Sequence, residues 1–130
     1  MSQGTALPYA VMEGKGAYNR NARVQVNGAA LATPLLEKAA QKVALDLGPQ
    51  PLVVADYGSS QGKNSLSPID IALRNLRPRL RPDRSIFVFH IDQPSNDFNT
   101  LFEILSCDPN RYAQHDPNVF PCAIGKSFYE

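Results

Sequence analysis

The chain has 130 residues, of which 43% are apolar and 19% charged, so it can bury one domain-sized core and is not a disordered tail. A net charge of +1 argues against a dedicated nucleic-acid-binding protein, and no apolar run approaches the ~18–20 residues that span a bilayer. The first residues do not resemble a secretory signal, and Cys107 and Cys122 lack CxxC spacing, so we expect a cytoplasmic protein with free thiols.

The first clear elements are a helix and a strand. Thr33 suits a helix cap, and Pro34 suits the first helical position because it has no N–H to lose there. The expected apolar face comprises Leu35, Leu36, Ala39, Ala40, Val43 and Leu47, and Gly48 and Pro49 would end this helix. Residues 51–56, PLVVAD, are a short apolar run typical of a strand buried on both faces.

A second helix, a strong strand and a third helix follow. Ser67 and Pro68 repeat the cap-plus-proline signal, and Pro78 would end or kink that helix. Its inward positions are Ile69, Ala72, Leu73 and Leu76. Residues 85–92, SIFVFHID, predict the second strand. Asn96 or Asp97 can cap the third helix, whose apolar face would be Phe98, Leu101, Phe102 and Leu105.

The last part of the chain predicts a polar loop over residues 106–117 and a weaker strand over residues 119–124, which Pro121 interrupts. Alternating helices and strands indicate an α/β fold with a parallel sheet. Ligands of such sheets bind outside the carboxyl ends of the strands. This places Asp56, Gly58, Gly62 and Asp92 at the expected site, although both carboxylates could instead serve as ordinary caps.

Two nucleotide-binding motifs fail at this loop. A P-loop needs four residues between its glycines and a Ser or Thr after the Lys, whereas residues 58–64 read GSSQGKN. The segment DYGSSQG also lacks the GxGxxG of dinucleotide-binding proteins. The remaining pattern, DxGxxxG, resembles a loop associated with methyltransferases that use S-adenosylmethionine.

Four segments in order resemble the SABATH family of carboxyl methyltransferases, which includes the salicylic acid, benzoic acid and theobromine types. Residues 12–25, MEGKGAYNRNARVQ, are similar to the GxG…YxxNSxxQ motif of that family. Residues 55–64, ADYGSSQGKN, resemble ADLGCSSGPN, and residues 92–99, DQPSNDFN, resemble DLPGNDFN. Residues 127–129, SFY, match the end of PGSFY. The resemblance implies a Rossmann-like methyltransferase sheet with flanking helices, of which this chain would be the N-terminal portion.

The resemblance also implies roles for single residues. Tyr18, Asp56 and Asn64 would surround the methionine part of S-adenosylmethionine, and Gly58 would be a further cofactor-binding residue. Asp92 would accept the ribose hydroxyls, Gln93 would flank the adenosine, and Ser127 and Phe128 would hold the adenine. Gln25 would donate its amide to the carboxylate of a small organic acid. The implied reaction transfers a methyl group to that carboxylate, with no metal and no general base, and a homodimer is a further expectation.

The chain also departs from the family pattern. Ala22, Ser59, Lys63 and Gln93 replace the usual Ser, Cys, Pro and Leu, and Lys63 is expected to point to solvent. We expect residues 1–32 to form a segment that caps substrate and cofactor, and residues 33–130 to form a partial cofactor-binding domain. Because family members continue well beyond this length, the alternative is a truncated, non-catalytic methyltransferase-like binding or assembly module.

Other residues have plainer interpretations. His90 in an apolar strand is expected to be a satisfied core histidine. His115, with Asp108 and Asp116, lacks metal-ligand spacing and suits a solvated loop. The arginines of residues 74–84 are expected to be solvated and to favour the end of the second helix.

Overall fold

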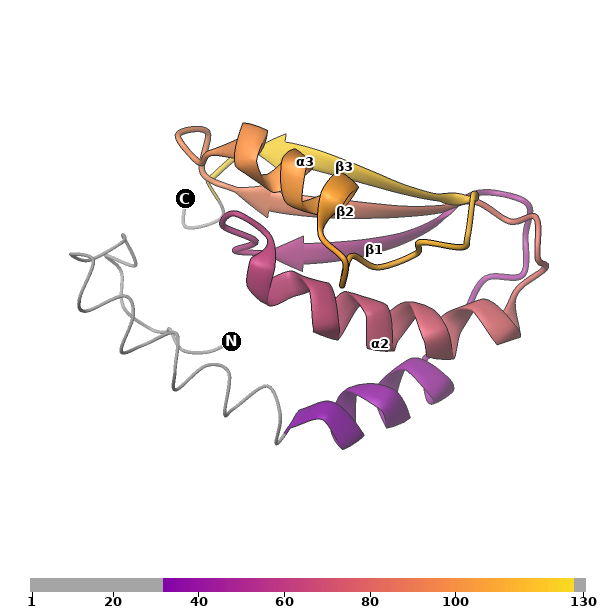
Figure 1. Ribbon diagram of the computed structural model, residues 1–130. Coiled ribbons are helices and arrows are strands. Elements are labelled where there is room, and N and C mark those ends of the chain that lie inside the picture. Colours follow the sequence, from indigo (N-terminus) through magenta and orange to yellow (C-terminus); the bar gives the residue numbers. More distant parts are fainter. Residues whose placement is uncertain (1–31, 128–130) are drawn as a thin grey trace.

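The computed structural model describes residues 32–127 (Figure 1). Residues 32–42 are helical. The strands are β1 (Leu52–Tyr57), β2 (Ile86–Asp92) and β3 (Val119–Gly125), and the α-helices are α2 (Leu66–Leu76) and α3 (Phe98–Cys107). Short 3-10 helices, η1 (Lys63–Ser65) and η2 (Arg77–Arg79), flank α2. No helix of this described part is long and apolar enough to cross a membrane.

The three strands form one parallel sheet in the order β1-β2-β3. Asp56 pairs with His90, and Asp92 pairs with Gly125, so the carboxyl ends of the strands meet at one edge of the sheet. Helix α2 connects β1 to β2, and helix α3 connects β2 to β3. These connections confirm the parallel α/β fold that the sequence predicts.

Helices α2 and α3 lie against the same face of the sheet (Figure 1). Their apolar sides meet the inward residues of β2, Ile86 and Val88, which are fully buried. Leu101 of α3 is also fully buried in this cluster. The helical residues 32–42 lie beyond α2, where Ala40 packs against the α2 side chains (Figure 1).

The expectation that residues 51–56 are buried on both faces is wrong. Inward and outward residues alternate along β1, and Val53 and Tyr57 are 54% and 65% exposed. Val53 continues across the outer face as a row with Phe87 and Phe120. The reason is that both connecting helices pack on the other face, so within residues 32–127 no helix covers this one.

Three helix boundaries and two helix faces differ from the sequence prediction. Thr33 lies inside the helical residues 32–42, so it is not the cap of the first helix. Of the apolar face expected for that helix Ala40 is buried, but Leu35, Val43 and Leu47 are 69%, 49% and 81% exposed.

The helical residues end at 42, before Leu47, and the Arg79 guanidinium donates hydrogen bonds to the carbonyls of Ala40 (2.7 Å) and Val43 (2.5 Å) at this helix end. Helix α2 begins at Leu66, so Ser67 is not its cap.

Helix α3 is capped by Asp97, as predicted, and Asp97 accepts the Thr100 N–H at 3.0 Å. The expected apolar face of α3 is right for Leu101 and Leu105, but Phe102 is 40% exposed. At helical spacing Phe102 turns one position away from the buried stripe.

The expectation that the arginine run is solvated is wrong for three of its members. Arg84 is buried and donates to the carbonyls of Gln50 (2.8 Å) and Asp46. Arg77 donates to the carbonyls of Arg81 and Arg84 and pairs with Asp116 at 2.8 Å, and Arg79 is used at the first helix. These guanidinium groups satisfy carbonyls in loops and at the end of the first helix that the fold would otherwise leave without donors.

Strand β3 forms despite Pro121, which pairs with Val88. In the described sheet β3 has a neighbour on one side alone, and an edge strand can accommodate a residue without an N–H.

Candidate functional site

The loop after β1 turns sharply and lies on the end of β2. Gly58 and Gly62 have φ angles of 79° and 92°, and Ser60 has a φ of 50°. The N–H groups of Gly58 and Ser59 both donate to the Ile91 carbonyl, at 2.8 and 3.4 Å. The left-handed conformation at the glycines costs little because glycine has no Cβ. Hydrogen bonds therefore hold this loop, which follows β1, to the neighbouring strand β2.

Asp92, at the carboxyl end of β2, also binds the loop that follows β1. Its Oδ2 accepts the Ser60 N–H at 2.7 Å, and its Oδ1 accepts the Gln93 N–H at 2.7 Å. The Asn96 side chain donates to the Ser60 carbonyl at 2.7 Å. A carboxylate oxygen can accept two hydrogen bonds, so each Asp92 oxygen can still accept one from a hydroxyl group. These two free acceptor positions suit a ligand that carries two adjacent hydroxyls, which would donate to them.

Asp56 lies one residue before the end of β1 and pairs with His90, two residues before Asp92. Its Oδ2 accepts the Ser65 hydroxyl at 2.6 Å and contacts His90 Nδ1 at 2.8 Å. His90 is fully buried, and its Nε2 lies 2.6 Å from the Tyr112 hydroxyl. The interpretation of His90 as a satisfied core histidine is confirmed.

Sequence reasoning did not assign Ser65 or Tyr112 to this site. The polar loop predicted over residues 106–117 conceals Tyr112, which is buried. One signal was available: in parallel pairing, the strand residue opposite Asp56 is His90, so a polar partner for that ring was to be expected.

The remaining predicted residues lie at the same edge of the sheet or outside the described part. Gln93 follows β2, Ser127 lies two residues beyond β3, and Asn64 lies exposed in η1. The structure therefore gathers the six predicted residues that it describes at one edge, and joins Asp92 to the β1 loop directly: Asp56, Gly58, Asn64, Asp92, Gln93 and Ser127. The roles expected of Tyr18, Gln25 and Phe128 fall on residues outside the described range.

Lys63 is turned away from this edge. Its ammonium group is exposed and pairs with Asp108 at 2.6 Å, beyond the end of α3. The hydrogen bond from Lys63, followed by the Asn110 N–H, lowers the pKa of Asp108. The expectation that Lys63 points to solvent is confirmed, and its charge is balanced locally.

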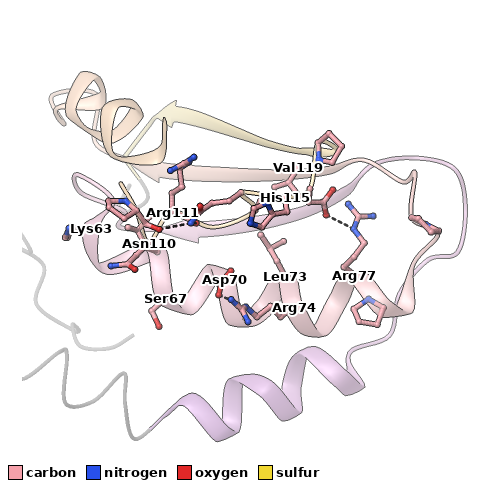
Figure 2. Close-up of a pocket in the computed structure, with 18 residues that line it drawn as sticks. Lys63, Ser67, Asp70, Leu73, Arg74, Arg77, Asn110, Arg111, His115 and Val119 are labelled. Carbon is pink, nitrogen blue, oxygen red and sulfur yellow. Dashed lines mark hydrogen bonds and ion pairs between the residues drawn. The ribbon is translucent and has the colours of Figure 1, made fainter. Parts of the chain in front are cut away.

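A groove of about 1110 Å³ lies elsewhere, between α2 and the chain from Pro109 to Val119 (Figure 2). Along it, Arg74 pairs with Asp70 at 2.6 Å and Arg77 pairs with Asp116. None of the six residues at the strand ends lines this groove. Across residues 32–127 no three His, Cys, Asp or Glu side chains are grouped to hold a metal ion.

Comparison with known proteins gives a consistent picture. The family model described as "SAM dependent carboxyl methyltransferase" matches residues 8–130. The methyltransferase LUC1 of Fusarium sp is 34% identical over 91% of this chain and 32% of its own length. Anthranilate O-methyltransferase 2 of Zea mays is 35% identical over 76% of this chain and 28% of its own length.

A solved structure agrees with these relatives. The structure titled loganic acid methyltransferase with SAH superposes with a TM-score of 0.58 at 27% identity, over 75% of this chain and 28% of that one. The chain thus spans about a third of the length of the proteins it matches.

Proposed function

Because the chain belongs to the family of S-adenosylmethionine-dependent carboxyl methyltransferases, we propose that it forms the cofactor-binding part of an enzyme that methylates the carboxylate of a small organic acid. The observation that carries the proposal is the pair of carboxylates, Asp56 and Asp92, at the ends of adjacent strands beside a glycine loop. Since the chain spans about a third of its relatives, the acceptor pocket would need more than the described residues.

The donor and acceptor chemistry of this edge fits S-adenosylmethionine. Asp92 retains one acceptor position on each oxygen, which suits the two ribose hydroxyls. Asp56 retains its Oδ1, which accepts no hydrogen bond within residues 32–127 and suits the cationic methionine end of the cofactor. Gly58 lets the backbone approach a ligand closely at this point.

The other proposed contacts follow the family motif. Tyr18 and Asn64 would line the methionine part, Gln93 would flank the adenosine, and Ser127 and Phe128 would hold the adenine. Gln25 would donate to the carboxylate of the acceptor. These assignments complete the two carboxylate contacts with neutral donors and an aromatic face.

The chemistry requires positioning more than proton transfer. Bound S-adenosylmethionine would supply the methyl group, which passes from sulfur to a carboxylate oxygen while the C–S electron pair stays on sulfur. A carboxylic acid is ionised near neutral pH, so the acceptor needs no base from this chain. Asp56, Asp92 and Gln25 would hold the reacting groups in line, which is where the rate gain arises.

Calorimetric titration with S-adenosylhomocysteine tests the proposal. We expect saturable binding by the purified chain and an affinity at least about tenfold weaker in Asp92→Ala, because charge-assisted hydrogen bonds are lost. Asp70→Ala is the matched control, since Asp70 pairs with Arg74 on α2 away from the strand ends, and its affinity should equal that of the wild type.

The outcomes separate two readings. Unchanged affinity in Asp92→Ala would remove Asp92 from the site. No binding by the wild-type chain would favour the alternative, a non-catalytic module that has the family fold.

A further inference from the structure

Four polar side chains form a continuous hydrogen-bonded chain beneath the carboxyl edge of the sheet. Tyr112 contacts His90 at 2.6 Å, His90 contacts Asp56 at 2.8 Å, and Ser65 donates to Asp56 at 2.6 Å. The four residues come from the connection after α3, from β2, from β1 and from η1. Elements far apart in the sequence therefore converge on one carboxylate.

The chemistry of the groups fixes the direction of these bonds in the neutral ring. An ionised carboxylate can only accept, so His90 Nδ1 carries the proton and donates to Asp56 Oδ2. His90 Nε2 must then accept, and Tyr112 donates to it. Burial, and to a lesser degree the charge of Asp56, raise the pKa of Tyr112, so its hydroxyl keeps the proton that this bond needs.

The arrangement occupies one oxygen of Asp56 twice and leaves the other open. Oδ2 accepts from both His90 and Ser65, whereas Oδ1 accepts nothing within residues 32–127. Ser65 is the N-cap residue of α2, yet its side chain makes no capping bond and is turned to Asp56 instead. The 3-10 turn η1 leads directly into α2 with Ser65 already helical (φ −84°, ψ −19°), so the Ser65 hydroxyl is available to orient Asp56.

We propose that His90 is a positioning residue that locks the Asp56 carboxylate, with Oδ1 presented to the methionine end of the cofactor and Tyr112 bonded to the far side of the His90 ring. This inference rests on the proposed function. A buried polar chain of this kind is seldom more stable than apolar packing of the same volume, which fits a role in the site. His90 acts through Asp56 and does not itself touch the cofactor.

Two substitutions of similar size separate positioning from simple packing. His90→Asn keeps an N–H donor near the place of Nδ1 and loses the contact with Tyr112. His90→Gln reaches the place of Nε2 and loses the contact with Asp56. We expect affinity for S-adenosylhomocysteine within about threefold of wild type in His90→Asn, and at least about tenfold weaker in His90→Gln.

A double-mutant cycle measures whether His90 affects cofactor binding through Asp56. A residue that only packs would give additive effects. His90→Leu should weaken binding about tenfold in the wild-type background and have no further effect in the Asp56→Ala background. Each variant is titrated at a temperature well below its own thermal unfolding midpoint, which circular dichroism measures. A variant that is partly unfolded is then not mistaken for one that binds weakly. Tyr112→Phe removes only the outer hydrogen bond, so its affinity should stay within about threefold of wild type, as in His90→Asn.

The failures of the two proposals are distinct. If the wild-type chain does not bind S-adenosylhomocysteine, the proposed function is overturned and the positioning role with it. If the wild type binds, but His90→Asn is as weak as His90→Gln or the cycle is additive, the positioning role alone is overturned.

Discussion

Gly62 packs directly against Leu101, so that a Cβ added to Gly62 would come within 2.5 Å of the Leu101 Cδ1 atom. The contact joins the end of the β1 loop to the centre of α3. Gly62 also has a φ of 92°, which side-chain-bearing residues rarely adopt. Two independent constraints, one steric and one conformational, therefore fall on a single residue.

We expect Gly62→Ala to lower the free energy of unfolding by about 1–3 kcal/mol, because the new methyl group both strains the backbone and displaces Leu101. Urea denaturation measures the change. Gly48→Ala is the control: its new methyl group would meet only side-chain oxygens, of which Gln50 Oε1 at 3.0 Å is the nearest, and these can move. Equal losses in the two variants would contradict this account.

The burial of α3 predicts a contrast between neighbouring apolar residues. Leu101 is fully buried, so Leu101→Ala should cost about 2–5 kcal/mol through the cavity that it leaves. Phe102 is 40% exposed, and Phe102→Ala should cost less than about 1 kcal/mol, although it removes more atoms. Thermal or urea denaturation of both variants decides the point, and the reverse order would show that the helix faces are wrongly placed.

The arginines of residues 74–84 should contribute differently to the stability of the fold. Arg84→Ala should cost about 1–3 kcal/mol, since it leaves the carbonyls of Asp46 and Gln50 without their donors. Arg81, whose side chain is 82% exposed, pairs with Asp83 at the surface, and Arg81→Ala should change stability by no more than about 0.5 kcal/mol. Similar losses in both variants would mean that charge alone, and not the carbonyl contacts, matters here.

Asp97 predicts a pH dependence. The hydrogen bonds from the side chain and then the backbone of Thr100 lower the pKa of Asp97 below its ordinary value of 3.8. A depressed folded-state pKa means that the stabilisation is complete above pH 3.8 and is lost as the pH falls through the folded value. The gap between the unfolding midpoints of wild type and Asp97→Ala should therefore be widest near neutral pH and close in acid. A gap that stays constant across this range would exclude the carboxylate as its source.

The sequence predicts the carboxylates of the candidate site better than the buried residues that hold them in place. Asp56 and Asp92 are visible as acids that follow apolar runs, because parallel strands bring their carboxyl ends together. Tyr112 was not visible, since its burial depends on how the long connection after α3 folds back. Val53 was placed wrongly for a related reason: an apolar run shows that a strand can be buried, but not which faces its own helices cover.

The hydrogen bonds of the β1 loop also fix how long that loop must be. Gly58 and Ser59 are held by Ile91, Ser60 is held by Asp92, and Gly62 donates back to the Ser59 carbonyl at 2.9 Å. An inserted residue would move Ser60 out of register with Asp92, and a deleted one would leave too little chain to reach η1. We therefore expect the loop to tolerate a changed side chain more readily than a changed number of residues.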